Sequence, residues 1–192
     1  MDGPLGAPAS LAVEQRARGR VESHIELMTR TRQSYREAHE RFVKRLREAE
    51  DDAVHRSPAG GGWSVVQIAW HVAAVDGQFA EIVSGARPVA QPLGPDAGEK
   101  PWTDLVAGMP QKIEAGKRVQ PPPDVRREAV LDLLSDSAAK LDAALANLDE
   151  QRGAGYAITH PAIGTITLRQ FGEWATAHTI RHNAQAKRVL GR

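Results

Sequence analysis

Residues 167–190, TLRQFGEWATAHTIRHNAQAKRVL, are the stretch of sequence that decides the fold. Steps of three and four residues place six side chains on one face of a helix: Phe171, Ala175, His178, His182, Gln185 and Val189. Such a face is normally apolar, but the middle of this one holds two histidines and a glutamine. Side chains four residues apart lie one helical turn from each other, so both imidazoles can point at a single ion. The spacing predicts an amphipathic helix whose inner face binds a metal.

Capping signals predict where this helix and one other helix begin. Thr167 can serve as the N-cap, and Gln170, three residues later, completes a capping box. The same pattern occurs upstream, where Ser64 is followed by Gln67. Gly85 then supplies a signal for a helix end. We therefore expect a second helix between Ser64 and Gly85.

The helix that follows Ser64 contributes a third histidine. His71 lies seven residues after its N-cap, whereas His178 and His182 lie eleven and fifteen residues after Thr167. At about 100° per residue, all three point to broadly the same side of their helices. They can therefore converge if both helices turn that side to a shared core. The alternative is that they are three core histidines, bonded to the backbone or to carboxylates.

Three neutral imidazoles would leave a divalent ion with open coordination positions. An open position is typical of a catalytic metal site rather than a structural one. Zinc suits three nitrogen ligands best, and nickel, iron and manganese are alternatives, because affinity order alone does not select the metal in a cell. The chain has no cysteine, so its metal ligands must be nitrogen or oxygen, and any thiol must arrive with a cofactor.

Five other residues are weaker candidates for a role at the site. Three of them are candidates for contacting a cofactor: Gln185 on the inner face of the last helix, His160 just before that helix, and His39 on the stripe of the first helix. Asp76 and Glu173 are carboxylates that could orient an imidazole. No carboxylate has a spacing that identifies it as a general base.

The rest of the chain predicts two further helices. An apolar stripe predicts a first helix over residues 20–50, and residues 51–62 are expected to form a flexible connection. Asp124 is expected to cap a third helix that ends near residues 153–155. Residues 156–165 are expected to form a small strand pair.

A long proline-rich connection, residues 86–123, separates the second and third helices. Connections of this length are usually lids, binding loops or disordered segments. The sequence therefore predicts an all-α fold, a four-helix bundle with this connection between helices 2 and 3 and a small strand pair before helix 4. The connection argues against a plain up-down-up-down order. Residues 1–18 are expected to be a frayed tail, and residues 19–192 a single domain.

The composition excludes several classes of protein. With 41% apolar and 26% charged residues, the chain has the composition of a globular protein. Its 25 basic and 24 acidic residues give no reason to expect nucleic acid or an anionic membrane as a partner. No run reaches the roughly 18 apolar residues of a membrane span, and the N-terminus lacks the apolar segment of a secretory signal. We expect a cytoplasmic protein that acts on a small molecule.

Two segments, GWSVVQIAWHVAAVD (62–76) and HPAIGTITLRQFGEWATAHTIRHNAQ (160–185), resemble the DinB-like superfamily of metal-binding four-helix bundles. These proteins are unrelated to the DNA polymerase that shares the name. The resemblance covers about two-thirds of the chain, from Gly62 to the C-terminus. The matching positions are Trp63-Ser64, His71, Gly164, Thr167-Leu168, His178, His182 and Gln185.

The resemblance implies that His71, His178 and His182 hold a divalent ion at one end of the bundle. Some members of the superfamily are transferases or isomerases that use mycothiol, bacillithiol or glutathione, and the resemblance also implies a homodimer. We therefore expect thiol-dependent transfer or isomerisation of a small electrophile, with mycothiol or bacillithiol as the cofactor. The alternatives are a metal-dependent hydrolase and a non-catalytic module that binds a metal or another ligand.

Overall fold

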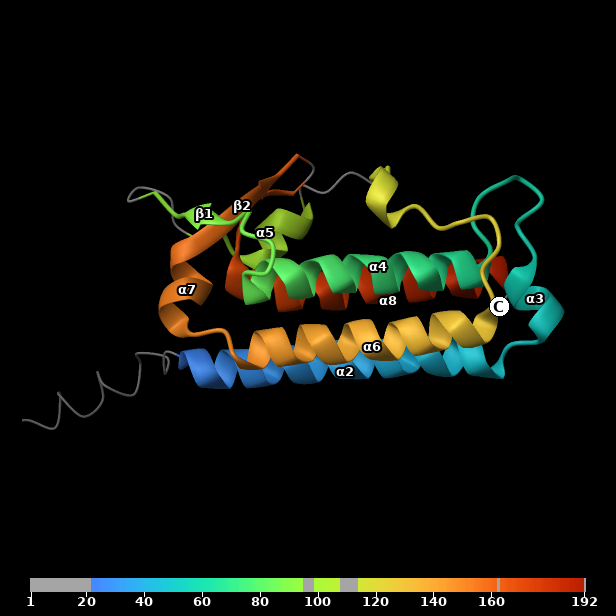
Figure 1. Cartoon of the computed structure of the whole chain (residues 1–192), viewed down its shortest axis with the longest axis horizontal. Helices are drawn as coiled ribbons and strands as arrows, with labels where there is room; N and C mark the ends of the chain where they lie inside the picture. Colours follow the sequence, from blue (N-terminus) through green and yellow to red (C-terminus); the bar gives the residue numbers. More distant parts are fainter. Residues whose placement is uncertain (1–21, 95–98, 108–113, 162, 192) are drawn as a thin grey trace, which may run out of the picture.

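The computed structural model describes residues 22–94, 99–107, 114–161 and 163–191. Four long helices lie side by side (Figure 1): α2 (His24–Glu48), α4 (Val65–Ser84), α6 (Arg127–Ala146) and α8 (Phe171–Val189). The predicted four-helix bundle is therefore confirmed. The predicted tail, residues 1–18, lies outside the described residues.

The directions of the helices follow from the long connection between α4 and α6. This connection returns along the bundle, so α4 and α6 run in one direction while α2 and α8 run in the other (Figure 1). The length of the connection predicted that the order would not be up-down-up-down, and the structure confirms this prediction. Both α4 and α2 pack against α6 and α8. The two helices that carry the three histidines, α4 and α8, are therefore antiparallel neighbours.

Both predicted capping boxes are present. The Ser64 hydroxyl accepts a hydrogen bond from the Gln67 backbone N–H, and the Gln67 side chain accepts one from the Ser64 N–H. Thr167 and Gln170 form the same reciprocal pair, but it caps a 3-10 turn, residues 168–170, and α8 itself begins after this turn, at Phe171. At the end of α4, Gly85 has a φ of 86°, a left-handed conformation that favours glycine. Local sequence signals therefore mark both ends of α4 and the turn that leads into α8.

The segment after α2 is more regular than predicted. The sequence predicts a flexible connection over residues 51–62, but α3 (Asp51–His55) occupies its first part. Asp51 and Asp52 lie in the first turn of this helix, where carboxylates interact favourably with the helix dipole. The proline and glycines that indicate a connection all follow α3.

The predicted start of α6 is wrong. Asp124 does not cap this helix, whose N-cap residue is Arg126. The next residue, Arg127, donates a hydrogen bond to the Ala49 carbonyl and lies 3.6 Å from the Asp51 carboxylate. Tertiary contacts with the end of α2 and with α3 therefore set the helix start, and a local capping signal does not.

The predicted third helix is in fact two helices. α6 stops at Ala146, and α7 (Glu150–Gly155) follows it. Asp149 caps α7 by accepting a hydrogen bond of 2.7 Å from the Arg152 N–H. The Arg152 guanidinium also donates to carbonyls at the end of α4, so α7 closes this end of the bundle.

The predicted strand pair is confirmed, and it gains a third strand. β2 (Tyr156–His160) and β3 (Gly164–Thr167) are antiparallel, and β1 (Gln91–Pro92), which comes from the long connection, pairs with β2. β3 then leads through a 3-10 turn, η2 (Leu168–Gln170), into α8. The sheet thus joins the connection to the start of the last helix.

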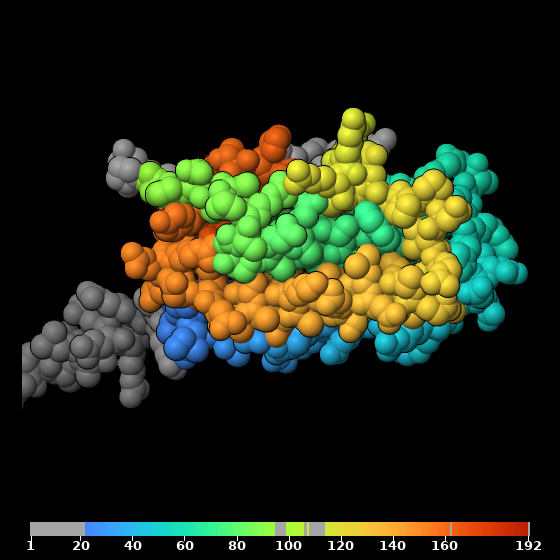
Figure 2. Space-filling model, viewed as in Figure 1, coloured from blue at the N-terminus to red at the C-terminus, as the bar shows by residue number. Residues whose placement is uncertain are grey.

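The connection also contains two short helical segments. In α5 (Trp102–Ala107), Leu105 is buried in the core and Trp102 packs against it. The 3-10 helix η1 (Lys117–Val119) lies next to α4, and the space-filling view shows this segment along the outside of that helix (Figure 2). Of the two segments, η1 therefore lies against α4 and α5 is anchored in the core.

The core extends along the whole bundle. Its largest fully buried side chains include Tyr35, Phe42, Leu46, Ile68, Leu134, Leu141 and Phe171. α2 and α8 approach closely at Gly172, where a Cβ would overlap the methyl group of Thr31. None of the described helices combines the length and the apolar character needed to cross a membrane.

Candidate metal centre

Three histidines converge between α4 and α8. One ring nitrogen each of His71, His178 and His182 lies within 4.8 Å of the other two. The Nε2 atoms of His71 and His178 are 3.2 Å apart, and the ring centroids of His178 and His182 are 4.4 Å apart. The structure therefore brings together all three residues that the sequence predicts as ligands.

A backbone carbonyl from the long connection orients His71. The Nδ1 atom of His71 lies 2.7 Å from the carbonyl oxygen of Val119 in η1. Because a carbonyl can only accept, Nδ1 carries the hydrogen, and Nε2 keeps its lone pair on the side of His178. The Trp63 ring packs against the same imidazole with centroids 4.9 Å apart. These contacts fix both the tautomer and the position of the ring.

Gln185 plays the equivalent part for His182. The Oε1 atom of Gln185 lies 2.8 Å from Nδ1 of His182, three residues earlier on α8. This acceptor places the hydrogen on Nδ1 and leaves the Nε2 lone pair available. The sequence singles out Gln185 without deciding its role, and in the structure it contacts a candidate ligand.

His178 lacks such an acceptor among the described residues. Its Nδ1 atom is buried without a hydrogen-bond partner there. Its other nitrogen lies beside the His71 Nε2, whose lone pair faces it. Buried polar groups are normally satisfied, so an incompletely bonded pair of imidazoles indicates a ligand that completes the cluster. The donor set of three imidazole nitrogens fits a divalent transition metal.

The cluster disfavours protonation. Burial, then the neighbouring His182, His71 and Arg181, hold the pKa of His178 well below its ordinary value. Burial, His71 and Arg181 lower the pKa of His182 to about 4, against the hydrogen bond to Gln185. Burial also lowers the pKa of His71, although the Val119 carbonyl opposes it. All three imidazoles are therefore neutral near pH 7, as metal ligands must be.

The two other candidate histidines lie outside the cluster. His39 is buried on α2, with its ring centroid 5.9 Å from that of Tyr35, and burial lowers its pKa. His160 lies in β2, with its ring centroid 5.1 Å from that of Trp174. Trp174 precedes His178 by one helical turn, so His160 borders the region of the site without joining it.

Neither candidate carboxylate orients an imidazole. Asp76 accepts a hydrogen bond of 2.8 Å from the Tyr35 hydroxyl, and burial raises its pKa to about 7. Burial and the charge of Glu99 raise the pKa of Glu173, while Arg30 and Arg169 oppose this rise. Those neighbours place Glu173 with the charged groups around the start of α8. The group of potential ligands found among the described residues contains histidines alone.

The sequence does not predict the contribution of the backbone near Val119 to the site. Gln67 donates to the carbonyls of Pro122 and Pro123, at 3.2 and 3.4 Å, so these bonds also hold the segment against α4. We call these bonds, together with that of His71 to Val119, the histidine contact. Every residue has a backbone carbonyl, so the sequence does not show which carbonyl will contact His71. The sequence of the long connection also does not show where on the bundle this segment will lie.

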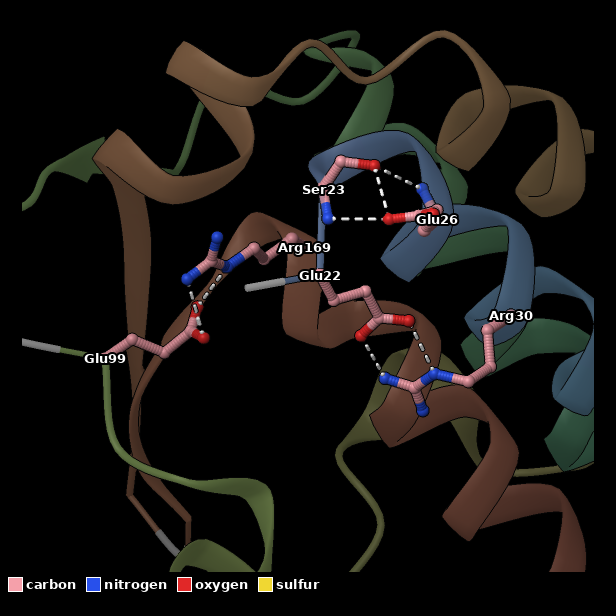
Figure 3. A network of polar contacts seen from close by, with 6 residues as sticks. All are labelled: Glu22, Ser23, Glu26, Arg30, Glu99 and Arg169. Carbon is pink, nitrogen blue, oxygen red and sulfur yellow. Dashed lines mark hydrogen bonds and ion pairs between the residues drawn. The ribbon is translucent and has the colours of Figure 1, made fainter. Parts of the chain in front are cut away.

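A second contact fixes the connection to the start of α8 (Figure 3). The Glu99 carboxylate accepts two hydrogen bonds from the Arg169 guanidinium, at 2.7 and 2.9 Å. It also accepts one from the Thr167 hydroxyl. Gln170 also donates to the Lys100 carbonyl at 2.8 Å. We call this group the glutamate contact. Together the two contacts attach the described parts of the connection to both helices of the metal centre.

The chain matches a known protein family over most of its length. The model of the DinB superfamily matches residues 34–186. Among solved structures, the chain is similar to a conserved protein from Enterococcus faecalis, with 19% identity, a TM-score of 0.54, and coverage of 84% of this chain and 94% of that one. At this identity the likeness shows the fold alone. No match was found among curated proteins.

Proposed function

The chain belongs to the DinB superfamily, and from this premise we propose that it is an enzyme with one divalent ion bound by His71, His178 and His182. The proposed reaction is transfer or isomerisation of a small electrophile with a low-molecular-weight thiol as cofactor. The observation that carries the proposal is the convergence of three neutral imidazoles, with His71 and His182 buried and His178 partly buried, each with one ring nitrogen within 4.8 Å of the other two.

The residues of the chain would prepare the site before any ligand enters it. The Val119 carbonyl and the Gln185 amide hold two imidazoles in the tautomer that presents Nε2. A divalent ion on this site would supply Lewis acidity that lowers the pKa of a bound thiol or water. We propose zinc as the first candidate because three nitrogen ligands with an open position suit it, with nickel, iron and manganese as alternatives.

Two features favour thiol chemistry over hydrolysis. A metal-dependent hydrolase usually needs a general base beside its water. In the described part of the chain the potential ligand group includes no carboxylate, since Asp76 bonds Tyr35 and Glu173 lies among the charges near Arg169. The chain also lacks cysteine, so no thiol of its own competes for the ion. We propose mycothiol or bacillithiol as the cofactor.

Cobalt substitution tests the thiol proposal directly. Binding of a thiolate to Co²⁺ in the site would add a sulfur-to-metal absorption band, so mycothiol or bacillithiol should change the visible spectrum. The His182→Ala variant should give no such change, whereas His55→Ala, an exposed histidine outside the cluster, should behave as the parent. A cobalt-loaded parent whose spectrum responds to no low-molecular-weight thiol would rule out the transferase. Turnover with esters would then favour the hydrolase, and no turnover a non-catalytic module.

The charge balance supports a small-molecule substrate rather than a nucleic acid or a membrane. Basic and acidic residues number 25 and 24, so the chain has no general attraction for polyanions. We also propose a homodimer, which sedimentation of the purified protein would distinguish from a monomer.

A further inference from the structure

A groove of about 450 Å³ runs between α4 and α6, on the face of the molecule seen in Figure 2. Its floor is made of small residues, among them Ala73, Gly77 and Ser137. A Cβ added at Gly77 would meet no atom within 4 Å, so the space above this residue is open. The groove is therefore large enough for a small organic molecule.

The charged side chains around this groove are unevenly paired. Lys140 and Asp136 form an ion pair of 2.6 Å across one turn of α6. Arg87 donates to the Gln78 side chain, whereas Arg118 makes no ion pair or hydrogen bond with the described residues. Glu81 is the remaining acid in the lining. Two guanidinium groups from different segments thus border one groove whose charge has a positive excess.

Guanidinium groups select particular anions. Their planar array of N–H donors matches the paired oxygens of a carboxylate or a phosphate. We infer that the groove between α4 and α6 binds a small organic anion that carries a carboxylate or phosphate group, with Arg118 and Arg87 as its main contacts. This site is separate from the three histidines and needs no metal to form.

The groove and the metal centre share one short segment. Arg118 and Val119 are neighbours in η1, so one residue borders the groove while the carbonyl of the next orients His71. An anion that holds Arg118 therefore also holds the turn that positions His71. Occupancy of the groove would then raise metal affinity, and a bound metal would raise anion affinity by the same factor. This coupling, unlike the anion site itself, depends on the proposed metal function.

Titration of the metal-free, full-length protein tests the anion site. Inorganic phosphate and succinate, each at fixed ionic strength, should show saturable binding by calorimetry. The anion that binds more tightly shows whether the groove prefers a phosphate or a carboxylate. Arg118→Gln should weaken binding about tenfold or more, because it removes charge-assisted hydrogen bonds. Gly77→Leu should do the same by filling the groove. Arg126→Gln, which changes an exposed arginine outside the groove lining, should bind as the parent.

Several results would overturn the anion site. Binding that is absent for both anions, or equal in Arg118→Gln, Gly77→Leu and Arg126→Gln, would show that the groove is not the site. Binding that disappears in His178→Ala would show that anions reach the protein through residual metal. All these variants are compared by circular dichroism first, so that an unfolded variant is not scored.

A second titration tests the coupling separately. Metal affinity, measured by competition with a chromophoric chelator, should rise severalfold in the parent when succinate is present, and should not rise in Arg118→Gln. An equal rise in both proteins would mean that the anion binds the ion directly, which contradicts the coupling through η1. A parent that binds succinate but no metal would retain the anion site and remove the proposed function, so the two failures are distinguishable.

Discussion

The long connection is attached to the bundle by two contacts of different chemistry. In the glutamate contact, Glu99 and Arg169 neutralise each other, and the ion pair raises the pKa of the arginine. In the histidine contact, His71 binds Val119, but its second nitrogen faces another imidazole whose Nδ1 has no partner among the described residues. The first network is complete within the chain. The second is incomplete and buried, which is the condition that marks a ligand site.

The metal centre beside the histidine contact and the glutamate contact should respond differently to acid, and this difference is the largest expected effect. The pKa of His182 falls from 6.5 to about 4 on folding, mainly because of burial. The unfolded chain therefore binds this proton first, and stability is lost as pH falls from 6.5 through about 4. For His182 alone the loss is about 3 kcal/mol. Urea unfolding of the metal-free protein across this range measures it.

The His178→Ala/His182→Ala double variant is the control for the acid experiment. It lacks two of the imidazoles whose pKa values are lowered, so its free energy of unfolding should depend less on pH over the same range. Identical pH dependence in parent and variant would mean that the cluster is not what resists protonation.

Removing the acceptor of His182 should weaken metal binding. Gln185→Leu removes the oxygen that holds Nδ1–H, and loss of such a partner costs about 10- to 100-fold in metal affinity. Gln185→Glu keeps an acceptor at the same place and should remain closer to the parent. Competition with a chelator gives the affinities. Equal affinities for the leucine variant and the parent would contradict the role assigned to Gln185.

Breaking the glutamate contact should lower the stability of the fold and leave metal binding unchanged. Arg169→Gln leaves the partly buried Glu99 carboxylate without its two charged donors, and we expect a loss of about 1–2 kcal/mol in the free energy of unfolding. Partial exposure of both side chains limits the effect. Urea unfolding should give the same loss with and without metal. A loss of stability that appears only when metal is bound would mean that the glutamate contact and the metal centre are energetically coupled.

The smallest effect is expected from the exposed ion pair of Figure 3. Arg30 and Glu22 are well hydrated, with side chains 59% and 39% exposed, so their attraction is largely screened by water and salt. Arg30→Gln should therefore leave the urea midpoint unchanged within error. If Arg30→Gln lost as much unfolding free energy as Arg169→Gln, solvent exposure would not be what limits the contribution of an ion pair in this protein.

The parts of the fold that the sequence predicts correctly depend on neighbours in the chain. Ser64 and Gln67, or Thr167 and Gln170, are three residues apart, and their reciprocal bonds form in the structure as predicted. The positions of the three histidines relative to these caps also predicted their convergence. Helical periodicity and capping act over one or two turns, so a single sequence can show them.

The parts that the sequence does not predict depend on distant residues. The bond from His71 to Val119 spans 48 positions, and that from Arg169 to Glu99 spans 70. Asp124 satisfies the local rule for an N-cap, but the contacts of Arg127 with the end of α2 override it. Each case requires knowledge of where the long connection or a neighbouring helix lies. Local patterns do not contain that information.

Metal content of the purified protein tests the central claim most directly. Mass spectrometry should find about one equivalent of a transition metal in the parent and in His55→Ala, and essentially none in the His178→Ala/His182→Ala variant. That result would establish the three-histidine site. A metal-repleted parent that holds no metal, or a double variant that holds as much as the parent, would mean that these histidines are core residues.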